Sequence, residues 1–149
     1  MDRSKVVVIR GTGVLARGGE IDTAKIAAML GLGIRHLTGT GEAKEALAGL
    51  FSRRDRVGIK VNTIGGRRIS TRPELSLALA NFLSESGIPG KNIVIWDRTN
   101  RELREAGYRL TDDLNGLKIF ATDTAGAGYE TEPVSHLNIG SLFSTIQTN

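Results

Sequence analysis

Two short stretches of the chain carry side chains that could do chemistry together. Lys60 and Asn62 stand at the end of the apolar segment Val57–Asn62, and Asp97 and Arg98 directly follow the next apolar segment. A strand covered on both faces does not keep a lysine in its middle unless the ammonium reaches an edge or a partner. A carboxylate opposite Lys60 could act as an acid/base group or orient the amine. Lys60 and Asp97 are therefore the candidate catalytic residues, and a plain ion pair of Asp97 with Arg98 is the alternative.

A glycine-rich basic loop lies between these two stretches. Its glycines allow the backbone to approach a ligand closely, and its arginines can chelate a carboxylate or phosphate. The candidate ligand-binding residues are Asn62, Gly65, Gly66, Arg67, Arg68, Arg72 and Arg98. A plain tight turn explains the two glycines equally well. The segment Thr71–Glu74 has the composition of a capping box, so Thr71 is expected to cap the next helix rather than to bind a ligand.

The periodicity of the sequence places these residues on a strand–helix–strand unit. Alternation predicts a strand over Val57–Asn62, apolar spacing predicts a helix from Pro73 to Gly87, and Asn92–Trp96 predicts the next strand. A right-handed crossover makes the two strands parallel, so their carboxyl ends share one edge of a sheet. Ligands of open α/β sheets bind outside that edge, and the amino end of the intervening helix also points there. We therefore expect an anion pocket at this carboxyl edge.

The remaining segments complete the predicted fold. Lys5–Arg10 is a nearly continuous apolar run, typical of a strand buried on both faces of a parallel sheet. Gly11–Ala16 superficially matches the dinucleotide fingerprint, but Gly18 and Gly19 keep the chain in a loop. The other expected elements are a helix over Thr23–Leu37 capped by Asp22, a short helix over Gly41–Phe51 with Ala43, Leu47 and Leu50 inward, a short helix opened by Thr99, and a strand over Leu117–Thr122. The predicted fold class is α/β, with a three-layer, mostly parallel sheet, helices on both faces and a Rossmann-like order without a dinucleotide fingerprint.

The composition limits the location of the protein and the kinds of site. The 149 residues suit a single α/β domain over 1–149. The chain has no cysteine, which excludes disulfides, a thiolate nucleophile and cysteine-ligated clusters within it. No apolar run reaches about 18 residues, so we expect a soluble, cytoplasmic protein without a membrane partner, although a removed leader would leave no trace. No metal is expected, because Asp97, Asp123 and His136 lack ligand spacing.

The stretch Val57–Tyr108 also carries a series of short motifs. They are Lys60-Val61-Asn62, Ser70-Thr71-Arg72-Pro73-Glu74-Leu75, Gly87-Ile88-Pro89, Trp96-Asp97-Arg98-Thr99 and Ala106-Gly107-Tyr108. With these motifs the stretch closely resembles the family catalogued as domain of unknown function 362. That family has no assigned activity, and some of its members are fused to ferredoxin-type iron–sulfur modules. The resemblance therefore implies redox-linked chemistry in the full-length family, with no cofactor held by this chain itself.

Two departures from that family qualify the resemblance. The histidine that usually precedes the proline is Arg72 here, which puts a proton-transfer or metal role at this position in doubt. Members of the family also continue past the length of this chain. We therefore interpret residues 1–149 as an amino-terminal part of a longer architecture, with a naturally shortened homologue as the alternative, and we expect catalysis to depend on the missing part.

Three functions are compatible with these observations. The leading one is binding of a small anion, a phosphate or carboxylate, at the carboxyl edge of the sheet. Nucleic-acid binding through the basic patch Arg53–Arg72 is disfavoured, because aromatic residues are few and no recognised signature is present. The third is a structural role, in which the apolar segment Val134–Ile146 forms a homodimer. The sequence fixes neither the identity of the ligand nor the reaction.

Overall fold

The computed structural model describes residues 4–126, 134–135 and 145–146 and shows an α/β structure, as predicted. Its elements in chain order are α1 (Thr23–Thr38), α2 (Ala43–Leu50), β1 (Val57–Lys60), α3 (Gly66–Ile69), α4 (Pro73–Glu85), the 3-10 turn η1 (Gly90–Asn92), β2 (Ile93–Trp96), α5 (Asn100–Glu105), β3 (Lys118–Ile119), β4 (Val134–Ser135) and β5 (Thr145–Ile146). No helix of the described residues is long and apolar enough to cross a membrane.

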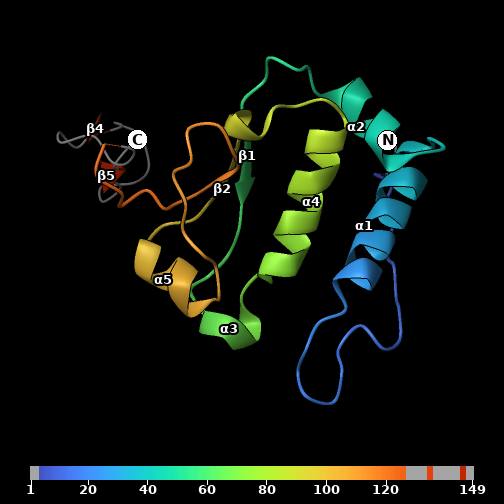
Figure 1. The fold of residues 1–149 in the computed structure, drawn as a ribbon, viewed down its shortest axis with the longest axis horizontal. Coiled ribbons are helices and arrows are strands. Elements are labelled where there is room, and N and C mark those ends of the chain that lie inside the picture. Colours follow the sequence, from blue (N-terminus) through green and yellow to red (C-terminus); the bar gives the residue numbers. More distant parts are fainter. Residues whose placement is uncertain (1–3, 127–133, 136–144, 147–149) are drawn as a thin grey trace.

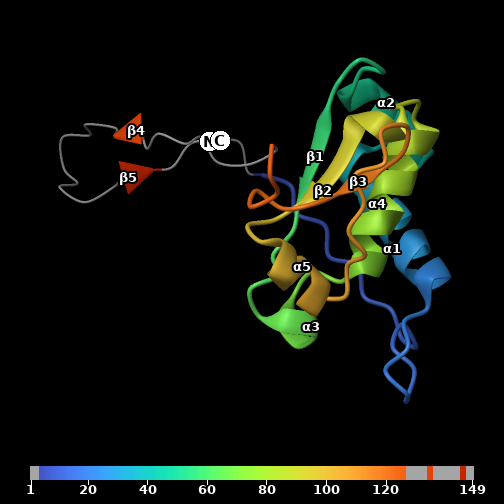
Figure 2. The same ribbon diagram turned by 60° about the vertical axis from the view of Figure 1, so that its left-hand side comes forward.

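Three parallel strands form the main sheet in the order β1–β2–β3 (Figure 1; Figure 2 labels all three). Val57 of β1 pairs with Ile93 of β2, and Ile95 of β2 pairs with Ile119 of β3. Backbone hydrogen bonds continue this pairing beyond the carboxyl end of each strand. The predicted positions of these three strands are confirmed, although the regular strands are shorter than expected. Their carboxyl ends share one edge, and α3 and α5 lie at that edge.

One face of this sheet forms the core. Val57 and Ile59 are buried, whereas Gly58 and Lys60 alternate with them and are exposed on the opposite face. Helix α4 packs against the sheet, and α1 and α2 pack against α4 (Figures 1 and 2). The buried core comprises Leu47, Val57, Ile59, Val61, Ala80, Leu83, Ile88, Ile93, Ile95, Leu103, Ala106, Tyr108, Ile119 and Ala121. In residues 4–126 we see helices on this face only, so the helical layer expected on the other face stays a prediction.

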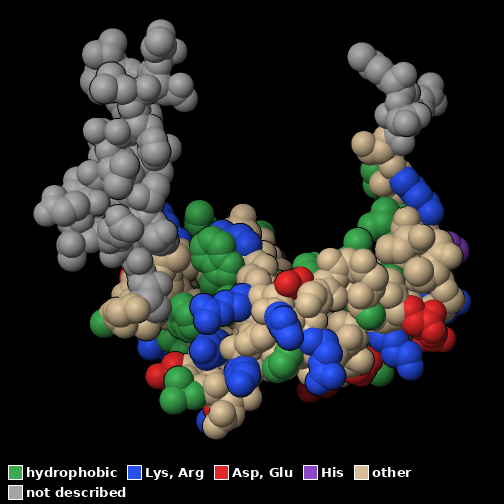
Figure 3. Space-filling model, turned by 90° about the horizontal axis from the view of Figure 1, so that it is seen from above, with side chains coloured by type: hydrophobic (Ala, Val, Ile, Leu, Met, Phe, Trp, Pro, Cys, Tyr) green, Lys and Arg blue, Asp and Glu red, His purple; other side chains and the backbone are tan. Residues whose placement is uncertain are grey.

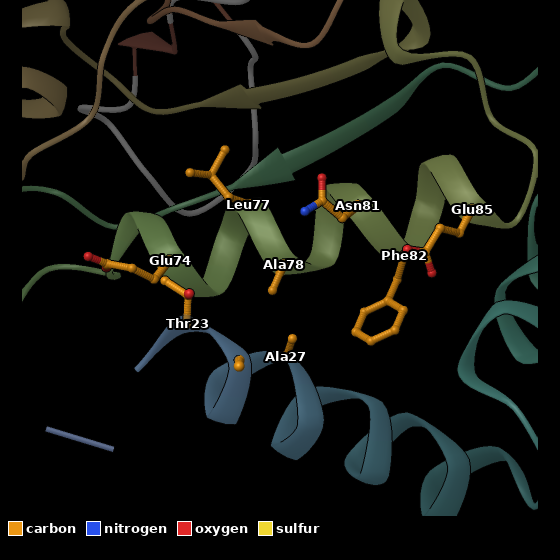
Figure 4. A pocket seen from close by; sticks show the side chains of 9 residues that line it. Thr23, Ala27, Glu74, Leu77, Ala78, Asn81, Phe82 and Glu85 are labelled. Carbon is orange, nitrogen blue, oxygen red and sulfur yellow. The ribbon is translucent and has the colours of Figure 1, made fainter. Parts of the chain in front are cut away.

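Helices α1 and α4 approach closely because small residues face one another. Figure 4 shows Ala78 and Phe82 of α4 directed toward α1, where Ala27 lies opposite. A groove of about 430 Å³ runs between the two helices. A Cβ atom added to Gly31 of α1 would lie only 3.1 Å from Cζ of Phe82. Gly31 thus leaves room for the Phe82 ring within an unbroken helix.

We expect Gly31→Ala and Gly33→Ala to differ in stability by about 1 kcal/mol, although both lie within α1. Alanine favours a helix over glycine by about 0.5–1 kcal/mol. At Gly33 the new methyl would meet only Ile9 at an ordinary 3.5 Å, so this gain should be realised. At Gly31 the crowded Phe82 ring should offset it. Urea unfolding of both variants measures the difference, and equal stabilisation would show that the close approach at Gly31 is not needed.

The predicted amino-terminal strand is wrong. Lys5–Arg10 forms no strand and lies alongside α1, where Val7 and Ile9 line an apolar groove of about 400 Å³. Val6 and Val8 point outward and are 81% and 70% exposed. An apolar run has the same composition whether it enters a sheet or lays alternate side chains on a helix. The hydrophobicity of Lys5–Arg10 therefore could not show whether this segment packs in the sheet or against α1.

The loop before α1 behaves as predicted, and the second helix does so in part. Residues 14–22 form a small hairpin with a bridge between Leu15 and Ile21, so no helix opens at the glycines. Asp22 caps α1 by accepting a hydrogen bond from the Lys25 amide at 3.0 Å. In α2, Ala43 and Leu47 are buried as expected, but Leu50 is exposed. The inward position expected for Leu50 is wrong, because α2 ends there and its last residue faces outward.

The carboxyl-terminal segment expected to form a homodimer lies mostly outside the described residues. Within Val134–Ile146 the structure describes only β4 and β5, which pair in antiparallel fashion. The homodimer therefore stays a prediction.

Candidate functional site

The structure brings Lys60 and Asp97 together at the carboxyl edge. The Nζ atom of Lys60 lies 2.6 Å from Oδ1 of Asp97, although the residues are 37 positions apart. The second carboxylate oxygen accepts hydrogen bonds from Thr63, 2.7 Å from the backbone nitrogen and 2.5 Å from Oγ1. Asp97 is therefore the centre of a cluster with Lys60 and Thr63, whereas the Arg98 side chain forms an ion pair with Glu102.

Burial and hydrogen bonding act in opposite directions on Asp97. The residue is only 3% exposed, and burial by itself opposes its ionisation. The hydrogen bonds from Lys60 and Thr63 outweigh that effect, so the pKa of Asp97 lies below its usual value. Asp97 is thus a permanent carboxylate at neutral pH. That state suits an orienter of Lys60 better than a general acid.

Lys60 is held on its other side by an aromatic ring. Its Nζ lies 5.7 Å from the centre of the Trp96 ring, within the range of a cation–π contact. Glycine at position 58 makes room for this indole, since a Cβ there would lie 3.0 Å from Nε1 of Trp96. The side chain of Lys60 is 52% exposed, so the ammonium is positioned and still open to a ligand.

Asn62 and Thr71 join the end of β1 to the start of α4. The two residues exchange hydrogen bonds: the Thr71 amide donates to the Asn62 carbonyl at 2.8 Å, and Thr71 Oγ1 accepts from the Asn62 amide at 3.1 Å. The Asn62 side chain caps its own loop by accepting from the Ile64 amide at 3.3 Å. Asn62 therefore has a structural role here, and its exposed side chain still lies at the predicted edge.

The predicted capping box at Thr71–Glu74 is wrong. Arg72 is the N-cap residue of α4 and Pro73 opens the helix, with no side-chain cap. The Oε2 atom of Glu74 is buried and has no hydrogen-bond partner among the described residues. The hydroxyl of Thr71 already accepts a hydrogen bond from the backbone amide of Asn62, just after β1, and the local pattern could not reveal this long-range partner.

The basic loop folds into the short helix α3 instead of remaining irregular. Gly66 adopts a positive φ of 61°, and a Cβ at Gly65 would lie 1.9 Å from Cγ1 of Ile69. Both glycines therefore have a steric reason to be present. Arg67 and Arg68 are exposed, and the Arg67 guanidinium group lies beside Gly107 at the end of α5. None of the described residues forms an ion pair with Arg67, Arg68 or Arg72.

Arg98 is placed at the edge but is paired. It donates to both carboxylate oxygens of Glu102 one helical turn later, through Nε and Nη2. This hydrogen bonding is the main reason that the pKa of Glu102 lies below its usual value. Thr99 caps α5 as predicted by accepting from the Glu102 amide at 3.2 Å. Arg98 therefore contributes less free positive charge than its position in the sequence suggested.

Several residues that shape the edge were missed by the sequence reasoning. Thr63 is fully buried beneath Asp97, and only its place after Asn62 could have indicated it. Asn100 connects α5 to the segment after β3 through two hydrogen bonds. Its side chain accepts one from the Ala121 amide and donates one to the Thr124 hydroxyl. Tyr108 donates to the Thr71 carbonyl at 3.1 Å, and burial raises its pKa. These contacts lock the loops around Lys60 and Asp97 into one unit.

No metal centre emerges from the part of the chain that the structure describes. No group of three or more His, Cys, Asp or Glu side chains is placed to hold an ion there. Asp97 already accepts hydrogen bonds from Lys60 and Thr63, and Asp123 accepts one from the Asn100 amide. His136 lies outside the described residues.

Comparison of the chain with protein-family models, curated proteins and solved structures found no match. The resemblance to domain of unknown function 362 therefore stays a prediction.

Proposed function

We propose that the carboxyl edge of the sheet binds a small anion, a phosphate or a carboxylate, next to Lys60. The main support is the imbalance of charge at this edge. Asp97 and Glu102 are each neutralised by one basic partner, Lys60 and Arg98. The exposed Arg67 and Arg68 and the half-buried Arg72 have no acidic partner among the described residues. Such uncompensated guanidinium groups can chelate an anion.

The role of each residue follows from its position. Arg67 and Arg68 would attract and hold the anion, and Lys60, oriented by Asp97 and Trp96, would contact its reactive part. Arg72 stands where α4 begins, so the positive end of that helix's dipole would add to the same field. Redox-linked chemistry in the full-length family that the chain resembles, and a Rossmann-like fold with a helical layer on the second face of the sheet, belong to this proposal as well. Neither is needed for anion binding.

The double charge reversal Arg67→Glu/Arg68→Glu should abolish stabilisation by inorganic phosphate or citrate. At a ligand concentration tenfold above Kd, binding stabilises the folded state by about 1.4 kcal/mol. For a chain of this size that raises the melting temperature by a few degrees. The measurement is a thermal-unfolding titration at low ionic strength, because salt screens exposed charges.

The control for this titration is Arg10→Glu/Arg17→Glu, which removes the same charge from the segment before α1. It should keep the response of the unmodified chain. A screen of phosphates and carboxylates that gives no shift with the unmodified chain would refute the proposal. An equal loss of the ligand-induced stabilisation in both double variants would show that it depends only on the net charge of the chain.

A further inference from the structure

A second group of basic side chains lies at the opposite end of the sheet. Arg56 precedes β1, Lys91 lies in the turn before β2, and Lys118 begins β3. Figure 3 looks onto this end of the molecule and shows Lys and Arg side chains gathered over it. These three residues line one cavity of about 510 Å³ together with Asn92, Ile93, Val94, Leu114 and Phe120.

The floor of this cavity is the open face of the sheet. Val57 faces the core, so Arg56 next to it belongs to the other face by alternation. Val94 pairs with Lys118 across β2 and β3 and lies on that same open face, and Phe120 continues it. The cavity thus combines apolar side chains below with cations around its rim, which is the lining expected for an anion that carries an apolar body.

The charge of the cavity is uncompensated. No Asp or Glu side chain is among its lining residues, and Arg56, Lys91 and Lys118 form no ion pair within residues 4–126. Three cations match the charge of a polyphosphate better than that of a single carboxylate. The volume falls within the usual range of about 300–1,000 Å³ for sites that enclose a small molecule.

We propose that this cavity is a second site, which binds a phosphorylated small molecule with an aromatic body, in the class of the nucleotides. Lys91, Lys118 and Arg56 would hold the phosphates, and Val94, Leu114 and Phe120 would contact the base. The site is separate from the carboxyl edge, because β1 lies between Arg56 and Lys60 and spans about 10–13 Å. The basic residues between Arg53 and Arg72 are thus divided between two sites at opposite ends of the sheet.

The test is calorimetric titration of the full chain with ATP, ADP and AMP at low salt. We expect binding that weakens as phosphates are removed, and at least about a tenfold loss of ATP affinity in Lys91→Glu/Lys118→Glu. The single neutral variants Lys91→Gln and Lys118→Gln should each lose part of it. They keep the test decisive if the double variant does not fold. Arg10→Glu/Arg17→Glu is the control with the same change of net charge and should bind as the unmodified chain does.

Arg67→Glu/Arg68→Glu separates this site from the carboxyl edge. It should leave ATP binding to the cavity unchanged even where it abolishes the response to inorganic phosphate or citrate. Loss of ATP binding in this variant, with retention in Lys91→Glu/Lys118→Glu, would overturn the second site. Absence of ATP binding, equal losses in the control, or binding of a single-stranded oligonucleotide without any mononucleotide binding would overturn it as well.

Discussion

Replacing Asp97 by alanine is expected to lower the free energy of unfolding by about 3–5 kcal/mol. Most of this loss comes from Thr63, whose amide and hydroxyl are fully buried and would keep no acceptor. The ion pair itself contributes less, because the Lys60 side chain is half exposed and can be hydrated once its partner is gone. Equilibrium unfolding in urea measures the change.

Asp55→Ala is the matched control for Asp97→Ala. Asp55 is an exposed aspartate that accepts one hydrogen bond, from the Ser52 amide at 2.8 Å. Its removal should cost less than about 1 kcal/mol. A comparably small cost at Asp97 would show that the cluster does not hold the edge together.

The contribution of Asp97 should also depend on pH. Its pKa is lowered in the folded state, so the charged form stabilises the fold at pH values above the unfolded pKa of about 3.9. That stabilisation is lost as the pH falls through the lower folded value. The difference in stability between the unmodified chain and Asp97→Asn should therefore be constant near neutrality and shrink below about pH 4. A difference that grows in acid would contradict the assigned charge state.

Leu103→Ala is expected to destabilise the protein by about 2–5 kcal/mol. Leu103 is the fully buried residue through which α5 reaches the core shared with Ile95 and Ile119. Truncation would leave a cavity under the helix that carries Thr99 and Glu102. The edge should loosen with it, so the thermal response to inorganic phosphate should weaken at temperatures where the variant is still folded.

Leu50→Ala serves as the comparison for Leu103→Ala, because Leu50 also lies on a short helix but is 66% exposed. Its truncation should cost only a few tenths of a kcal/mol, as is usual at the surface. Chemical unfolding of both variants gives the two values. Equal costs would show that α5 is not anchored through Leu103.

The strand–helix–strand unit around the site could be predicted from the sequence because its signals are local. Alternation in Val57–Asn62, the stop at Gly87 and the cap at Thr99 each depend on a few neighbouring residues, and the structure confirms them. The shared edge of Lys60 and Asp97 followed from one general rule, the handedness of the crossover.

The partners of these side chains were decided only by the tertiary structure. Lys5–Arg10 could not show whether it would join the sheet or lie on α1, and Thr71 gave no sign that Asn62 would take its hydroxyl. The basic residues between Arg53 and Arg72 formed one patch in the sequence, yet β1 carries them to two ends of the sheet. A local pattern determines which groups a segment exposes, and only the packing of distant segments determines which groups meet.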